Sequence, residues 1–333
     1  MLTVIIIFLW SSLLVYLLMG GADFGAGILE LFARGRHRKG IQQAAYRAIG
    51  PIWEANHMWL IIAVVILFVG FPSVYYTVSI HLHIPLVIML FGIIARGTAF
   101  TFRNYDAVHD QMQRVYDRIF IYSSFITPLF LGIIIGSAVG GTIDPGSSDF
   151  RSAYLDGWLN WFSVCVGFAT VCLCGLLAAI YLIGVVSENN ERRYLVRRIR
   201  LFSISLLGWG IAALMIAAHR QLPLAGFLWA GTLQQVMTCG SMVSLVMLWI
   251  ALNRGKIIQM RLAAGGFLFF ILVAATHSHY PGILLLKDGS TLSLLEEHAP
   301  ERTITVLATA LLGGSVLILP ALVYLLYRFG SKE

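Results

Sequence analysis

Four side chains could carry or balance charge inside otherwise apolar segments: Asp23, Glu54, His57 and Arg96. A charged group at the centre of a bilayer raises the free energy of insertion by about 3 kcal/mol, so such groups face protein or water and often mark functional sites. Glu54 and His57 are three residues apart and share one helix face. A carboxylate with an imidazole one turn deeper is what a proton path needs, so we expect Asp23, Glu54 and His57 to form one.

A purely structural role is the alternative for each acid. Arg96 could neutralise Asp23 or Glu54 and fix the packing of helices without any transport. Because a guanidinium stays protonated and relays protons poorly, we assign Arg96 as a structural counter-ion. Two acids and one arginine leave one carboxylate without a fixed cation. That carboxylate must be protonated or hydrated, and either state suits proton transfer.

Apolar runs separated by short polar stretches make up most of the chain. Its 333 residues are 59% hydrophobic and 12% charged, with a mean hydropathy of +0.83, which excludes an ordinary soluble protein. We predict an all-α, polytopic membrane helix bundle that forms a single integral membrane domain over 1–333. The nine predicted spans are 3–30, 50–72, 79–102, 118–140, 158–186, 200–219, 225–252, 261–280 and 303–327.

Basic residues are distributed unevenly between the predicted loops. Eighteen follow the odd-numbered spans or lie in the tail, and four lie in the other loops. The positive-inside rule therefore predicts an N-terminus outside and a C-terminus in the cytoplasm. This topology explains the net charge of +7 without a nucleic-acid partner. With this orientation Asp23, Glu54 and Arg96 share one depth, roughly 6–10 Å below the cytoplasmic surface at about 1.5 Å per residue.

Small residues surround Asp23 in the segment GGADFGAG. We expect Gly21, Gly25 and Gly27 to let a neighbouring helix approach closely, so that the carboxylate faces protein. The four cysteines lie in apolar runs without paired CxxC spacing, which indicates packing rather than a metal site. The sequence has no Walker A, GxGxxG or HExxH motif. We therefore expect no catalytic residue and no metal ligand in this chain.

Most histidines lie near the outer ends of the predicted spans, where two on facing helices could ligate a haem. Histidines near a membrane interface more often bond water or headgroups, so we expect this chain to bind no cofactor of its own. A small b-type cytochrome that uses these outer histidines stays an alternative. The histidines concerned are His81, His83, His219, His277 and His279.

Three segments on the first three predicted spans resemble subunit II of the cytochrome bd-type quinol oxidases. In chain order they are GGADFGAG, PIWEANHMWL and ARGTAFTFR. Further along, YDRIFIYSSFITPLFLGIIIGSAVGG is similar to that family's fourth span. YPGIL and STLSLLEEHAPERTITVLATALL are similar to its last loop and ninth span. The chain is therefore identified as a divergent member.

The resemblance implies a heterodimeric respiratory oxidase of a bacterial or archaeal cytoplasmic (inner) membrane. In that family subunit I carries haem b, haem d and the quinol site, and the haem-free subunit II supports its assembly. The complex oxidises quinol and reduces dioxygen to water. Asp23 matches the second acid of the family's DGFD motif, and Glu54 matches the acid of its W-D/E-G-N segment, which help line a cytoplasmic proton route. A structural quinone, bound lipids and a small third subunit are compatible with the resemblance.

Four positions depart from the family's pattern. Gly20 stands where the first DGFD acid is expected, Ala55 replaces a glycine, His57 replaces a glutamine and Thr101 stands where an acid is common. Either His57 and water substitute for the two missing acids, or the route is weakened or rerouted through the partner. A proton-coupled secondary transporter is a further alternative, which predicts inverted repeats and broken helices at mid-membrane.

Overall fold

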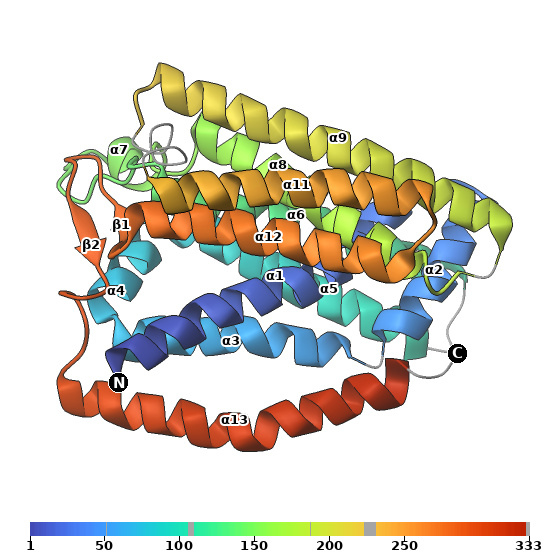
Figure 1. Cartoon of the computed structure of the whole chain (residues 1–333), viewed down its shortest axis with the longest axis horizontal. Helices are drawn as coiled ribbons and strands as arrows, with labels where there is room; N and C mark the ends of the chain where they lie inside the picture. The colour runs from blue at the N-terminus through green and yellow to red at the C-terminus, as the bar shows by residue number, and fades with distance from the viewer. Residues whose placement is uncertain (51, 106–109, 187, 223–230, 331–333) are drawn as a thin grey trace.

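The computed structural model describes residues 1–50, 52–105, 110–186, 188–222 and 231–330. Within these residues nine helices are long and apolar enough to cross a membrane, which confirms the predicted helix bundle (Figure 1). They are α1 (Leu2–Phe32), α3 (Trp53–Gly70), α5 (His83–Tyr105), α6 (Asp110–Val139), α8 (Trp161–Leu182), α9 (Asn189–His219), α11 (Thr232–Asn253), α12 (Ile257–His279) and α13 (Glu301–Gly330).

Short elements lie at the two ends of the bundle. Helix α2 (Arg36–Ile49) lies at the end where α1 finishes and α3 begins, which we call the basic end because most of the basic residues gather there. At the other end lie α4 (Pro72–His81), α7 (Phe150–Tyr154) and an antiparallel hairpin of β1 (Gly282–Leu285) and β2 (Thr291–Ser293). This hairpin is a small departure from an all-helical chain.

Helix α1 is central and packs against α3, α6, α8 and α13. The glycines of α1 permit this close packing. A Cβ atom on Gly25 would overlap the backbone carbonyl of Cys174 on α8, and one on Gly27 would overlap the side chain of Ser124 on α6. A Cβ on Gly21 would lie 3.2 Å from a methyl of Leu177. Small residues therefore bring α1 against two neighbouring helices at the level of Asp23.

Two helices begin at least eight residues earlier than the hydropathy pattern predicts. Helix α9 begins at Asn189 rather than at 200, and α6 begins at Asp110 rather than at 118. In α9 the early turns bury Leu195 and Ile199 while Arg193 and Arg197 stay exposed. These first turns are amphipathic. The mean hydropathy of the segment is therefore low, although its apolar residues recur with helical spacing.

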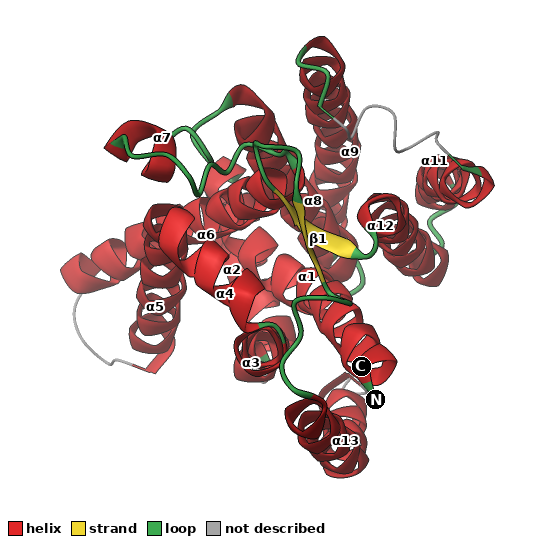
Figure 2. Ribbon diagram, turned by 90° about the vertical axis from the view of Figure 1, so that its left-hand side faces the viewer, coloured by secondary structure: helices red, strands yellow, loops and turns green. Residues whose placement is uncertain are grey.

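Helix α13 lies at the edge of the bundle (Figure 2). Only 6% of its apolar membrane window is buried, against 72% for α8. Large apolar side chains on it are open, including Leu317, which is 76% exposed. This helix therefore needs lipid or another protein to cover most of its surface.

Candidate functional site

Asp23 and Arg96 form a buried two-pronged ion pair between α1 and α5. Arg96 Nη1 donates to Asp23 Oδ2 over 2.7 Å, and Nη2 donates to Oδ1 over 2.5 Å. Nη2 also donates to the backbone carbonyl of Asp23 over 3.0 Å. The side chains of Asp23 and Arg96 are 0% and 1% exposed. This bidentate geometry offsets the desolvation of both charges, and Arg96 balances Asp23 rather than Glu54.

The rest of the guanidinium is held by α6 and by aromatic rings. Arg96 Nε donates to Ser124 Oγ over 3.2 Å. Its Cζ atom lies 5.1 Å from the ring centres of both Phe24 and Phe120. Contacts of this kind stabilise a desolvated cation. The pair therefore joins α1, α5 and α6 at one point.

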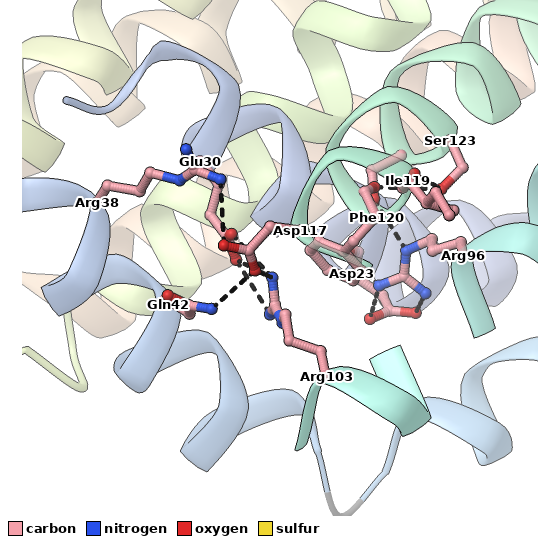
Figure 3. A network of polar contacts seen from close by, with 11 residues as sticks. Asp23, Glu30, Arg38, Gln42, Arg96, Arg103, Asp117, Ile119, Phe120 and Ser123 are labelled. Carbon is pink, nitrogen blue, oxygen red and sulfur yellow. Dashed lines mark hydrogen bonds and ion pairs between the residues drawn. The ribbon is translucent and has the colours of Figure 1, made fainter. Parts of the chain in front are cut away.

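A second buried pair, Glu30 with Arg103, lies closer to the basic end (Figure 3). Arg103 Nη1 donates to Glu30 Oε2 over 2.9 Å, with side-chain exposures of 3% and 0%. Asp117 of α6 lies 3.6 Å from Arg103 and 3.4 Å from Arg38. Gln42 Nε2 donates to Asp117 Oδ1, the oxygen that Arg103 approaches, over 3.2 Å. Helix α2 is thereby attached to the same network.

The Asp23–Arg96 and Glu30–Arg103 ion pairs have the same spacing in the sequence. We call the two pairs together the charge ladder. Asp23 and Glu30 are seven residues apart on α1, Arg96 and Arg103 are seven apart on α5, and each acid is 73 residues from its arginine. The equal spacing means that α1 and α5 run parallel in register. The third predicted span, 79–102, left Arg103 in the loop that follows it. The matching seven-residue spacing in the two segments is the signal that could have identified it.

His57 of α3 lies beside the first pair. Its Nε2 atom is 3.6 Å from Asp23 Oδ2, and its side chain is 16% exposed. Its ring centre is 5.6 Å from that of Phe24. Its Nδ1 atom is buried and has no hydrogen-bond partner among the described residues. The structure thus brings together Asp23 and His57, two of the three predicted proton-path residues.

Glu54 does not join the buried cluster, so the prediction that it is a buried charge is wrong. It lies in the first turn of α3 and its side chain is exposed. The helix begins at Trp53, which leaves Glu54 at the basic end, where its carboxylate also faces the positive end of the helix dipole. Thr101 is exposed as well, and its hydroxyl donates to the carbonyl of Gly97 over 3.0 Å.

The histidines at the other end make contacts within the protein. His81 Nδ1 lies 3.0 Å from the carbonyl of Ala153, and His277 Nδ1 lies 2.9 Å from the amide nitrogen of Gln234. His219 is exposed at the end of α9. No group of three or more His, Cys, Asp and Glu in the described part of the chain is arranged to hold a metal ion.

One cysteine, Cys174 of α8, packs against the glycines that flank Asp23. All four thiols are free, and Cys165, Cys172 and Cys174 are buried in α8. Cys239 is exposed, so the packing role that we predicted for it is wrong. Its side of α11 does not face the rest of the bundle.

Asp23, His57 and Glu54 can each have a different chemical role at these positions. The bidentate contact with Arg96 holds the Asp23 carboxylate in one position. His57 can gain or lose a proton beside that fixed negative charge. Glu54 stands one turn away on the same helix, at the end where water has access. A proton could therefore pass from water through Glu54 to His57, with Asp23 as the stationary counter-charge.

Comparisons with known proteins give one consistent answer. The family described as cytochrome bd terminal oxidase subunit II matches residues 1–329. Cytochrome bd ubiquinol oxidase subunit 2 of Bacillus subtilis (strain 168) is 31% identical over 172 residues, 50% of this chain and 49% of that protein. Cytochrome bd-I ubiquinol oxidase subunit 2 of Escherichia coli (strain K12) is 27% identical over 184 residues, 54% of this chain and 45% of that protein. The chain spans about half the length of the curated relatives it matches.

A solved structure shares the fold. A chain of the bd oxidase from Geobacillus thermodenitrificans matches with a TM-score of 0.77 and 20% sequence identity, over 99% of this chain and 100% of that chain. At this identity the likeness concerns the arrangement of the helices. It shows that the bundle in Figure 1 is an architecture found in a bd oxidase.

Proposed function

Because this chain belongs to the cytochrome bd terminal oxidase subunit II family, we propose that it is the haem-free second subunit of a respiratory quinol oxidase. The complex lies in a bacterial or archaeal cytoplasmic membrane, oxidises quinol and reduces dioxygen to water. Haem b and haem d belong to the partner, subunit I.

The reduction of dioxygen to water consumes protons, and this subunit supplies a route for them. The observation that carries this proposal is the 3.6 Å separation of His57 Nε2 from the buried carboxylate of Asp23. Glu54 takes up a proton from water at the basic end and His57 receives it. Asp23 lies close enough to attract the charged imidazole, and Arg96 holds the Asp23 carboxylate in place.

Assembly is the second contribution of this chain. The charge ladder ties α1, α5 and α6 together, and removing one member of a buried ion pair typically destabilises by about 3–5 kcal/mol. Open apolar side chains on the membrane helices, such as Phe68, Phe91 and Leu317, are 60%, 67% and 76% exposed. They offer a surface to the partner subunit and to lipids.

Purification of the tagged chain from its native membrane tests this proposal. We expect a larger haem-bearing polypeptide to accompany it, with haem b and haem d bands in the reduced-minus-oxidised spectrum. We expect quinol-driven oxygen consumption to fall at least about tenfold in His57→Phe, which keeps the ring volume but cannot titrate. A purified chain without a haem-bearing partner would contradict the subunit role. Full turnover in an assembled His57→Phe complex would contradict the proton route.

A further inference from the structure

The interface of α1 and α3 beyond Asp23 holds buried polar atoms without a partner. Among the described residues, Tyr16 Oη, Ser12 Oγ and His57 Nδ1 are buried and accept or donate no hydrogen bond. Tyr16 and Ser12 are 1% and 0% exposed. An unsatisfied buried polar group costs about 1–3 kcal/mol, so groups of this kind almost always bind a protein atom or an ordered water.

The phenol ring of Tyr16 is directed towards the charge ladder. It lies over Gly20, one turn further along α1, where a Cβ atom would come within 2.9 Å of the ring. The ring centres of Tyr16 and His57 are 6.1 Å apart, and those of Tyr16 and Phe24 are 6.4 Å apart. Gly20 therefore leaves room for Tyr16 to sit beside the imidazole.

The spacing along α1 continues the same face. Ser12 precedes Tyr16 by one turn, and Tyr16 precedes Asp23 by two turns. Ser12 also lines a cavity of about 400 Å³ between α1, α3 and α13. The Tyr16 ring lies on the side that faces Asp23, so its hydroxyl and the imidazole of His57 are the unpartnered groups nearest to the charge ladder.

We propose that ordered water links His57 Nδ1 to Tyr16 Oη, and that Tyr16 is the group that carries protons onward from His57. This inference rests on the proposed proton route. In each transfer the Nδ1–H bond of protonated His57 breaks and a water molecule takes the proton. Water passes a proton to Tyr16 Oη as the phenol O–H bond breaks and its proton goes to a second ordered water molecule. No electron moves, and each side chain returns to its neutral form.

A phenol with a purely structural role is the competing explanation. In that case the ring fills the space above Gly20 and the hydroxyl has no part in turnover. Tyr16→Phe separates the two, because it keeps the ring and removes only the oxygen.

The test uses the whole oxidase complex with quinol in excess, in ordinary and deuterated water. In Tyr16→Phe we expect oxygen consumption to fall about tenfold, the rate equivalent of one hydrogen bond worth about 1.4 kcal/mol in the transfer step. The solvent isotope effect should rise, since proton transfer becomes limiting, and haem content should be unchanged. Tyr194→Phe is the control, because Tyr194 Oη on α9 is also a buried phenol but lies beside Arg198 and away from Asp23. That variant should keep wild-type turnover and isotope effect.

The outcomes separate this inference from the proposed route. A slow His57→Phe with a wild-type Tyr16→Phe would overturn the inference and leave the route intact. Wild-type turnover in both would overturn both. If Tyr16→Phe does not assemble, Gly20→Ala decides, because its new Cβ would come within 2.9 Å of the Tyr16 ring and displace the hydroxyl. A lower rate with a larger isotope effect in that variant supports the inference, and a wild-type rate overturns it.

Discussion

Arg96 and Arg103 contact the same aromatic ring: their guanidinium carbons lie 5.1 and 4.1 Å from the centre of the Phe120 ring. Phe120 is 1% exposed and belongs to α6, which also supplies Ser124 and Asp117 to the network. The ring helps to exclude water from both ion pairs, where its face attracts the cations. The charge ladder is therefore one structure, and a change in either pair is expected to affect the other.

Removal of Arg103 should impair assembly. Arg103→Leu leaves the Glu30 carboxylate buried without its cation, so we expect a loss of about 3–5 kcal/mol in stability and a lower yield of haem-loaded complex. Thermal unfolding and haem content per protein measure this. Arg151→Leu is the control, because Arg151 pairs with Asp156 at 78% exposure and should change stability by less than about 0.5 kcal/mol. Equal yields for the two variants would contradict the structural role of the ladder.

A double change should separate assembly from turnover. Asp23→Leu alone leaves Arg96 buried without a counter-ion, whereas Asp23→Leu with Arg96→Leu replaces the pair with apolar contacts of similar volume, which is often close to neutral for stability. We expect the double variant to recover haem content while oxygen consumption stays low, since His57 has lost its neighbouring anion. Full turnover in the double variant would show that the pair serves packing alone.

Glu54→Gln should affect turnover without affecting assembly, because the side chain is exposed. We expect oxygen consumption to fall several-fold and to be partly restored by a small weak acid such as formic acid, which can deliver protons at an open site. Glu301→Gln, an exposed acid in the first turn of α13 at the other end, should leave the rate unchanged. A Glu54→Gln complex with normal rates would remove Glu54 from the route.

Gly25→Val should separate α1 from α8. Its side chain would overlap the carbonyl of Cys174, so we expect loss of assembled complex, measured by size-exclusion chromatography with haem absorbance. Gly208→Ala in α9 has no atom within 4 Å of the new Cβ and should be neutral or slightly stabilising. Assembly of Gly25→Val at the wild-type level would rule out this close approach.

The β1–β2 turn should weaken in acid. The side-chain and backbone hydrogen bonds from Ser290 lower the pKa of Asp288 below its usual 3.8. A lowered acid pKa means that the stabilisation is present above about pH 3.8 and is lost as the pH falls through the folded-state value. Hydrogen exchange at Gly282–Leu285 should therefore accelerate at low pH in the wild type, after correction for intrinsic rates. Asp288→Asn should remove most of that pH dependence.

The sequence was sufficient to predict the membrane helices, because long apolar runs rarely occur outside membrane-spanning segments. It also predicted a buried pair involving Arg96, since a cation inside an apolar segment needs an anion. The structure was needed to show which of the two acids, Asp23 or Glu54, pairs with Arg96. Both acids lie in apolar stretches, and only the position at which α3 begins shows that Glu54 is exposed.

The sequence alone did not identify Arg103 and Tyr16 as site residues. The reason differs between the two. Arg103 lies two residues before α5 ends at Tyr105, where an arginine usually reaches the interface. Its burial depends on Glu30 and Asp117 from other helices. Tyr16 has an ordinary place in a membrane helix. Its importance comes from Gly20 and His57, which are neighbours only after α1 and α3 pack together.

The equal separation of 73 residues within both rungs of the charge ladder has a consequence for biosynthesis. At a translation rate of about 5–20 residues per second, each carboxylate of α1 leaves the ribosome about 4–15 s before the arginine that neutralises it. During this interval α1 carries two acids without their cations, and it cannot settle stably among lipid chains. Helix α1 must therefore stay in contact with water or with the insertion machinery until α5 has emerged.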